Sequence, residues 1–200
     1  MTTLVAVSQR VAVDLPRGER FDALDQRWTT FLASCGLVPL LLPNEPAAAV
    51  ALMTDVPVRG LLLTGGNSLT VYGGDAPERD RTELDVLAVA RARGLPVVGV
   101  CRGMQVILHA SGVPLRPVEG HAGTSHQVTA DRSVNSFHQF AAVGDAGPLT
   151  VLARSDDGVV EAVRHPLDAI VGIMWHPERC EPFADEDVRM FRGRFLGDVR

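Results

Sequence analysis

Apolar and polar positions along the first 111 residues form two alternating kinds of segment. One kind is short and apolar throughout, and it predicts strands over residues 4–9, 37–43, 59–66 and 95–100. The other repeats its apolar positions with helical spacing, and it predicts helices over 20–35, 78–94 and 102–111, with a short Ala-rich helix after residue 43. Strands that are apolar throughout are typical of parallel strands buried between helices. The pattern therefore predicts an α/β fold of three layers (αβα), flavodoxin-like, with a mostly parallel sheet.

The predicted helix over 20–35 would place five apolar side chains on one buried face: Phe21, Leu24, Trp28, Phe31 and Leu32. After residue 112 the pattern changes to shorter strand-like pieces, at 126–130, 133–138, 149–155, 158–165 and 169–176. The last piece is apolar enough to rejoin the main sheet, and a polar helix near 183–196 follows it. No repeat, low-complexity tract or linker interrupts the chain, so we expect one domain over residues 1–200. We expect its functional site outside the carboxyl ends of the strands.

The composition narrows the classes of function. With 46% hydrophobic and 22% charged residues, the 200-residue chain is typical of a globular protein. A net charge of −5 with scattered positive residues argues against nucleic acid as a partner. Every cationic side chain apart from histidine is Arg, so a lysine Schiff base or a lysine general base is excluded.

The N-terminal residues and the cysteines indicate a location. Residues 1–10 lack the features of a secretory signal, and no apolar stretch approaches the ~20 residues that cross a bilayer. Cys35, Cys101 and Cys180 are too few and too widely spaced for a disulfide framework or a CxxC metal site. We therefore expect a cytoplasmic protein with no membrane partner.

The stretch VVGVCRGMQ, residues 97–105, joins a predicted strand to a predicted helix through Gly-x-Cys-x-Gly. This is the layout of a nucleophile elbow, in which glycines are needed where a side chain would collide with the neighbouring helix or strand. Cys101 would then precede a helix N-terminus, whose dipole favours a thiolate. Taken alone, the stretch leaves two interpretations open, a nucleophile and an inert core thiol.

The stretch WHPE, residues 175–178, directly follows the last predicted strand. A nucleophilic thiol needs a base, and the base needs a third group that orients it. His176 is the candidate base and Glu178 the candidate orienting group, because we expect Pro177 to keep the intervening chain extended. By itself the stretch could be a surface turn, and the Cys101 elbow favours the catalytic interpretation.

A glycine pair, Gly65 and Gly66, ends the strand predicted over 59–66. Glycines at such a position let backbone N–H groups point into a crevice, and acyl transfer needs such donors for the developing oxyanion. We expect the amides of Gly66 and Arg102 to form this oxyanion hole. An ordinary strand-to-loop turn is the alternative for the glycine pair alone.

Together, GVCRGMQ, WHPE and the upstream TGG resemble the class I glutamine amidotransferase superfamily, and the similarity covers essentially the whole chain. The resemblance implies a single domain of that type, a γ-glutamyl thioester on Cys101, a Cys101–His176–Glu178 triad and no metal or organic cofactor. It also implies the residues that hold the substrate. These are Gln105 for the glutamyl group, and Ser136, Phe137 and His138 of VNSFHQ for its α-amino and α-carboxyl ends, partly through the backbone.

Further segments, among them SQR at 8–10, LDQRW at 24–28 and EGHAGTSHQV at 119–128, resemble the γ-glutamyl hydrolase branch. Within it they are similar to hydrolases of γ-glutamyl-CDP-amidate from capsule phosphoramidate biosynthesis. This resemblance implies a reaction that releases glutamate and cytidine diphosphoramidate. A diphosphate needs cationic or N–H donors, and the candidates are Arg10, Asn67 and the backbone around Gly65. Arg10 could equally be a plain surface residue.

Two other functions stay open on the sequence alone. One is a glutaminase subunit that supplies ammonia to a separate synthase, and the other is a γ-glutamyl hydrolase for another small amine such as γ-aminobutyrate. His121 and His126 have a spacing that could suit a metal, but no further ligands converge in the sequence, so no metal site is expected. The C-terminal helix and the 37–43 edge could pack against a second copy in a homodimer, although no feature requires it.

Overall fold

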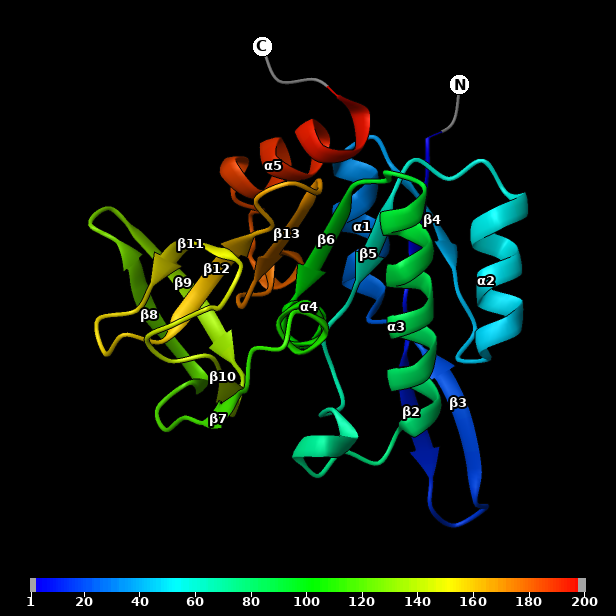
Figure 1. Cartoon of the computed structure of the whole chain (residues 1–200), viewed down its shortest axis with the longest axis horizontal. Helices are drawn as coiled ribbons and strands as arrows, with labels where there is room; N and C mark the ends of the chain where they lie inside the picture. Colours follow the sequence, from blue (N-terminus) through cyan, green and yellow to red (C-terminus); the bar gives the residue numbers. More distant parts are fainter. Residues whose placement is uncertain (1–2, 198–200) are drawn as a thin grey trace.

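A seven-stranded sheet forms the middle layer of the computed structural model, which describes residues 3–197 (Figure 1). In spatial order its strands are β11 (Thr150–Arg154), β12 (Val160–Arg164), β13 (Ile170–Ile173), β6 (Val97–Val100), β5 (Leu61–Leu63), β1 (Leu4–Val7) and β4 (Val38–Leu41). The five strands from β13 to β4 are parallel, and β12 is antiparallel to both of its neighbours. The mostly parallel sheet predicted from the apolar runs is confirmed.

Helices cover both faces of this sheet (Figure 1). They are α1 (Gln26–Ser34), α2 (Pro46–Asp55), α3 (Pro77–Ala92), α4 (Arg102–Ala110) and α5 (Asp185–Leu196). Phe31 of α1 and Phe191 of α5 belong to the same core as Val5 of β1, whereas α2, α3 and α4 share the other core with the adjacent Ala6. Successive residues of a strand point to opposite faces, so a strand between two helical layers must be apolar throughout. The three-layer αβα architecture is therefore confirmed.

Smaller hairpins and turns lie outside the main sheet. They are the hairpin of β2 (Arg10–Asp14) and β3 (Glu19–Ala23), the hairpin of β8 (Ala122–Thr129) and β9 (Arg132–Phe137), the short pair of β7 (Arg116–Pro117) and β10 (Phe140–Ala141), and the 3-10 turns η1 (Thr70–Tyr72) and η2 (Pro177–Arg179). In Figure 1 the β2–β3 hairpin projects beyond the carboxyl end of β1, and the β8–β9 hairpin lies beside β11 and β12.

The helix predicted over 20–35 is wrong in its first six residues, because the chain forms β3 there and α1 begins only at Gln26. Phe21 is 49% exposed on the hairpin rather than buried on a helix face. The Asp25 side chain accepts a hydrogen bond from the Arg27 N–H at 3.1 Å and caps α1. Pairing of β3 with β2 and this N-cap fix the helix start, and neither depends on apolar periodicity.

The last strand of the sheet lies between two earlier ones. β13 pairs in parallel with β6, with Ile173 opposite Val100, and antiparallel with β12. The chain therefore leaves β6 and β13 at the same edge of the sheet, so Cys101 and the residues after β13 are neighbours. No helix within residues 3–197 has the length and apolar character that a membrane-spanning segment requires.

Candidate active site

Cys101 lies in a strained turn between β6 and α4. Its φ of 52° and ψ of −105° place a non-glycine residue in a region that L-residues rarely adopt. The backbone packs closely on both sides of this turn. A Cβ at Gly99 would lie 2.6 Å from the backbone carbon of Gly103, and a Cβ at Gly103 would lie 2.1 Å from the Leu63 oxygen. The two glycines are thus required by close approach, which is the reason the sequence pattern suggested.

The Cys101 thiol lines a cavity of about 230 Å³. Only 7% of the residue is exposed, and the cavity wall also includes Gly66, Gln105, Phe137 and His138. The structure therefore brings most of the predicted substrate-binding positions around the thiol. A buried thiol that opens into a cavity can meet a small substrate while bulk water is largely kept away.

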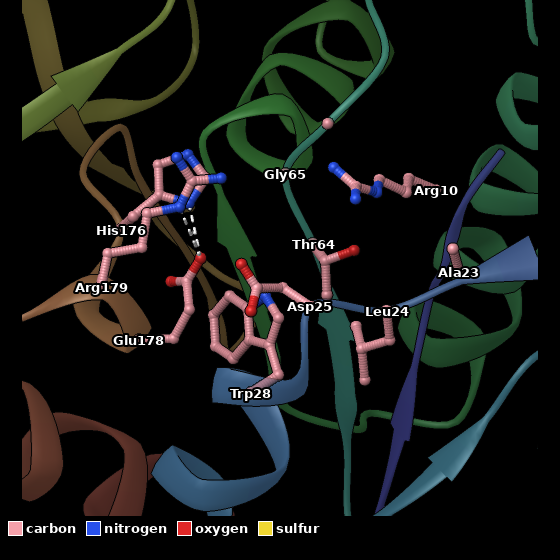
Figure 2. Close-up of a pocket in the computed structure, with 11 residues that line it drawn as sticks. Arg10, Ala23, Leu24, Asp25, Trp28, Thr64, Gly65, His176, Glu178 and Arg179 are labelled. Carbon is pink, nitrogen blue, oxygen red and sulfur yellow. Dashed lines mark hydrogen bonds and ion pairs between the residues drawn. The ribbon is translucent and has the colours of Figure 1, made fainter. Parts of the chain in front are cut away.

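His176 and Glu178 form the second part of the site, at the carboxyl end of β13. The imidazole Nδ1 lies 2.7 Å from Glu178 Oε1, and both side chains are almost fully buried (Figure 2). The expectation of an extended chain at Pro177 is wrong, because Pro177 opens the 3-10 turn η2. Proline fits the first position of a helical turn, and this tight turn folds the carboxylate back onto the ring.

His176 is held in a charged environment. Burial alone would lower the pKa of its imidazole, but the interactions of the ring with Cys101 and Glu178 outweigh that effect and raise the pKa to about 9. The ring therefore carries a proton at neutral pH and faces the thiol on one side and the carboxylate on the other. This is the arrangement in which a cysteine can act as a thiolate.

Asn135 fixes the backbone of His176, a role that the sequence analysis missed. Its Oδ1 accepts from the His176 N–H at 2.8 Å, and its Nδ2 donates to the His176 carbonyl at 2.8 Å. Asn135 stands in VNSFHQ, directly before the residues that were singled out there. A paired amide of this kind leaves no mark in the sequence apart from the asparagine itself.

The loop after β5 carries the glycine pair. A Cβ at Gly65 would lie 2.5 Å from His176 Cε1, so only glycine lets the imidazole pack against the chain. Gly66 has a φ of 88° and lines the Cys101 cavity. Neither the Gly66 nor the Arg102 amide N–H has a hydrogen-bond partner within residues 3–197. Both predicted oxyanion donors are thus available in the structure.

Arg79 supports this loop from behind, and sequence reasoning missed it by treating residues 78–80 only as a helix start. Its guanidinium is fully buried and donates to the carbonyls of Thr64, Gly65 and Gly66 at 2.8, 2.9 and 3.0 Å. It also pairs with Glu83 at 2.9 Å. Burial lowers the pKa of Arg79 to about 9, which leaves it charged at neutral pH.

Arg102 completes a buried charged network behind the elbow. Its side chain is 1% exposed and forms ion pairs with Asp80 and Glu83, so the guanidinium is already engaged within the protein. Burial, followed by the nearby positive charge of Arg79, lowers the pKa of Arg102 well below its usual value. Two guanidinium groups and two carboxylates thus join α3 to the start of α4.

Three of the predicted substrate-binding side chains are already engaged. The Asn67 amide accepts from the Val11 N–H at 2.9 Å and donates to the Val11 carbonyl at 3.0 Å, so it anchors β2 in this structure. Ser136 is buried and donates to the His121 carbonyl at 2.6 Å, and it is absent from the lining of the Cys101 cavity. Gln105 lines the cavity, and its Nε2 donates to the Phe140 carbonyl at 2.8 Å.

A crevice on the other side of His176 is flanked by two arginines. Figure 2 shows the Arg10 guanidinium directed toward Gly65 and Arg179 beside His176 and Glu178, and all five residues line the crevice. Arg10 is exposed, and its side chain passes over Gly66. The Arg179 Cζ atom lies 4.5 Å from the centroid of the Phe137 ring. The Phe137 and His176 rings are nearly perpendicular, with their centroids 5.6 Å apart. Arg179 was not predicted, although it directly follows WHPE in the sequence.

Comparisons with known proteins identify the family of this chain. The family model described as Peptidase C26 matches residues 3–129 and 113–178. Gamma-glutamyl-CDP-amidate hydrolase from Campylobacter jejuni is 35% identical over 127 residues, which span 61% of this chain and 63% of that protein. Gamma-glutamyl-gamma-aminobutyrate hydrolase from Escherichia coli O157:H7 is 29% identical over 207 residues, which span 81% of each chain. A glutamine amidotransferase structure from Thermotoga maritima superposes with a TM-score of 0.66 at 11% identity, over 98% of this chain and 85% of that one, and shows the shared fold.

Proposed function

Because the chain belongs to the Peptidase C26 family, we propose that it hydrolyses a γ-glutamyl amide bond with Cys101 as its nucleophile. The observation that carries this proposal is the buried series of Cys101, His176 and Glu178 at the carboxyl ends of two adjacent strands. A thiol, an imidazole that acts on it and a carboxylate that orients the imidazole are the three parts that thiol-dependent acyl transfer needs.

In the first half of the reaction, the Cys101 sulfur attacks the γ-carbonyl carbon. The carbonyl oxygen becomes negatively charged, and the amide N–H groups of Gly66 and Arg102 donate to it. The C–N bond then breaks, and His176 transfers its proton to the leaving nitrogen. The products of this half are a free amine and a γ-glutamyl thioester on Cys101.

In the second half, neutral His176 removes a proton from a water molecule that attacks the thioester. The C–S bond breaks, glutamate leaves, and the thiolate and the imidazolium are restored. Glu178 keeps Nδ1 protonated throughout, so Nε2 is the nitrogen that faces the thiol and the water. No step in this scheme requires a metal or an organic cofactor.

The leaving amine that we favour is a nucleotide diphosphoramidate, with γ-glutamyl-CDP-amidate as the substrate. The Campylobacter jejuni relative is named for this substrate. Arg10 and Arg179 flank the crevice beside His176, where the leaving nitrogen would emerge, and guanidinium groups bind phosphate in bidentate fashion. Products of this reaction would be glutamate and cytidine diphosphoramidate, of the kind used in capsule biosynthesis.

A second leaving amine is γ-aminobutyrate. The Escherichia coli relative named for it aligns over a larger share of this chain than the Campylobacter jejuni protein does. Its carboxylate would meet the same two arginines. A diphosphate carries more negative charge than a carboxylate, so the two substrates should differ in how strongly they depend on Arg10.

The test is release of free glutamate from three substrates by the isolated full-length chain: γ-glutamyl-CDP-amidate, γ-glutamyl-γ-aminobutyrate and glutamine. We expect hydrolysis of the first, no turnover by Cys101→Ala, and an acyl-enzyme adduct detectable by mass spectrometry in the wild-type protein. Turnover retained by a folded Cys101→Ala variant would sink the proposed mechanism. Glutaminase activity that appears only with a partner synthase would favour the ammonia-supplying subunit instead.

A further inference from the structure

Three histidines and one glutamate meet beside the Cys101 cavity, outside the proposed triad. His121 precedes β8, His126 lies within it, His138 follows β9, and Glu161 is in β12. One nitrogen from each imidazole and a carboxylate oxygen of Glu161 all lie within 4.8 Å of one another. The sequence analysis expected no metal site because only His121 and His126 were near each other in the chain. The fold supplies the two further ligands that were missing.

The distances within this His3Glu cluster suit a four-coordinate cation. Glu161 Oε1 lies 3.0 Å from His126 Nε2, 3.2 Å from His138 Nε2 and 3.4 Å from His121 Nδ1. In a tetrahedral zinc site with ligands at 2.0–2.1 Å, neighbouring donor atoms are about 3.3 Å apart. We propose that His121, His126, His138 and Glu161 bind a divalent transition-metal ion of the zinc class.

Unpaired polar atoms point to a ligand here. His121 Nδ1, His126 Nε2 and Glu161 Oε2 are buried and have no hydrogen-bond partner within residues 3–197. The two nitrogens lie close to Glu161 Oε1 but do not meet it with hydrogen-bond geometry. His138 and Glu161 are fully buried at their side chains. Buried donors and acceptors are normally paired, and a cation in their midst would satisfy them and neutralise the carboxylate.

The surroundings also resemble the outer shell of a metal site. His121 Nε2 lies 2.9 Å from Asp157 Oδ2, and Asp157 is itself held by the Ser155 hydroxyl at 2.5 Å. A carboxylate on the far nitrogen fixes the tautomer of a metal-binding histidine and leaves its other nitrogen free to coordinate.

Four protein ligands without an open position indicate a structural ion rather than a catalytic one. The ion would join the β8–β9 hairpin to β12, which belong to separate sheets. His138 lines the Cys101 cavity, and the adjacent Phe137 packs against His176. A bound cation would therefore hold one wall of the proposed active site in place.

The experiment measures metal binding by the full-length protein in a Cys101→Ser background, because a free thiol beside His176 would itself compete for zinc. Protein stripped with a chelator is titrated with Zn²⁺ against a chromophoric chelator, and the bound ion is counted by elemental analysis. Co²⁺ then serves as an optical probe of coordination. We expect one ion per chain and the absorption spectrum of tetrahedral Co²⁺.

Variants locate the bound ion. His126→Gln changes the most accessible of the three imidazoles and should weaken Zn²⁺ binding at least tenfold, and Asp157→Asn should weaken it about 10- to 100-fold through the outer shell. His109→Gln, on α4 and outside the cluster, is the matched control and should leave binding unchanged. Circular dichroism establishes that each variant is folded.

Absence of stoichiometric binding by the folded parent protein would overturn the proposal, and so would binding that is unchanged in both His126→Gln and Asp157→Asn. If a ligand variant fails to fold, the Co²⁺ spectrum of the parent and the Asp157→Asn titration still decide the question. Binding is measured without turnover, so its outcome is independent of whether the chain proves to be a γ-glutamyl hydrolase.

Discussion

Replacing Arg79 by lysine tests whether the buried guanidinium positions the loop that carries the Gly66 amide. Arginine donates from several nitrogens in one plane, and here three consecutive carbonyls of the loop accept from it. A lysine ammonium keeps the charge but cannot reach all three carbonyls and Glu83 together. The substitution therefore separates the charge at this position from the shape of the donor.

The expected loss of stability follows from the bonds that lysine cannot replace. At least two charge-assisted hydrogen bonds are lost, each worth about 1.5–3 kcal/mol, which gives about 3–5 kcal/mol once some relaxation is allowed. Stabilities of natural domains are about 5–15 kcal/mol, so Arg79→Lys should fold but melt well below the wild-type protein.

The expected loss of activity follows from displacement of the loop that carries the Gly66 amide. A displacement of about 1 Å in a positioned group lowers turnover about 100-fold, and loss of one oxyanion donor lowers it about 100- to 1,000-fold. We therefore expect kcat of Arg79→Lys to fall about 100-fold, with KM changed far less because Arg79 does not line the Cys101 cavity.

The assay is glutamate release at a temperature where urea titration shows the variant to be folded, with Arg81→Lys as the matched control. Arg81 is exposed on the same helix, two residues away, and its change should alter neither kcat nor stability. A folded Arg79→Lys protein with kcat within about twofold of wild type would refute the positioning role. A fall in stability alone would show that the guanidinium only holds the structure together.

Three other changes follow from the same geometry. Gly65→Ala would place a Cβ 2.5 Å from His176 Cε1, so the imidazole must move, and kcat measured by glutamate release should fall about 100-fold. Asn67→Ala removes both hydrogen bonds to Val11 and should destabilise the protein by about 1–3 kcal/mol in urea titration, with faster amide exchange at Val11 as the local sign. The pKa of His176 is about 9 in the folded chain against an ordinary value of 6.5, so its contribution to stability is complete below pH 6.5 and is lost as the pH rises through 9. That contribution is about 3 kcal/mol, and Glu178→Gln should reduce the difference in unfolding free energy between pH 6 and pH 9.5, whereas an unchanged difference would exclude Glu178 as a cause of the raised His176 pKa.

The parts of the site that could be predicted are those whose residues lie close together in the sequence. The elbow at Cys101 depends on glycines two residues away on each side, and His176 and Glu178 are two residues apart. Their meeting follows from parallel strands, because β6 and β13 end at the same edge. Apolar runs were sufficient to predict this sheet.

The parts that were missed depend on pairs far apart in the chain. Arg79 serves carbonyls 13 to 15 residues before it, and Asn135 pairs with a backbone 41 residues later. The His3Glu cluster brings Glu161 of β12 to three histidines in and beside the β8–β9 hairpin, and no local pattern in the sequence predicts this contact. Strand β3 was predicted as the start of a helix because Phe21 and Leu24 continue, by chance, the apolar spacing of the true helix α1.

The place of β13 in the sheet has a consequence for synthesis of the protein. A chain emerging from the ribosome carries β6 long before it carries β13, so the Val97–Val100 edge stays unpaired until residues 170–173 are made. An open, apolar strand edge is a template for association with other chains. Nascent or truncated chains that end before residue 170 should therefore aggregate, and they would carry the nucleophile without its base. If Cys101 and His176 act as proposed, a chain that lacks its last sheet strand should release no glutamate.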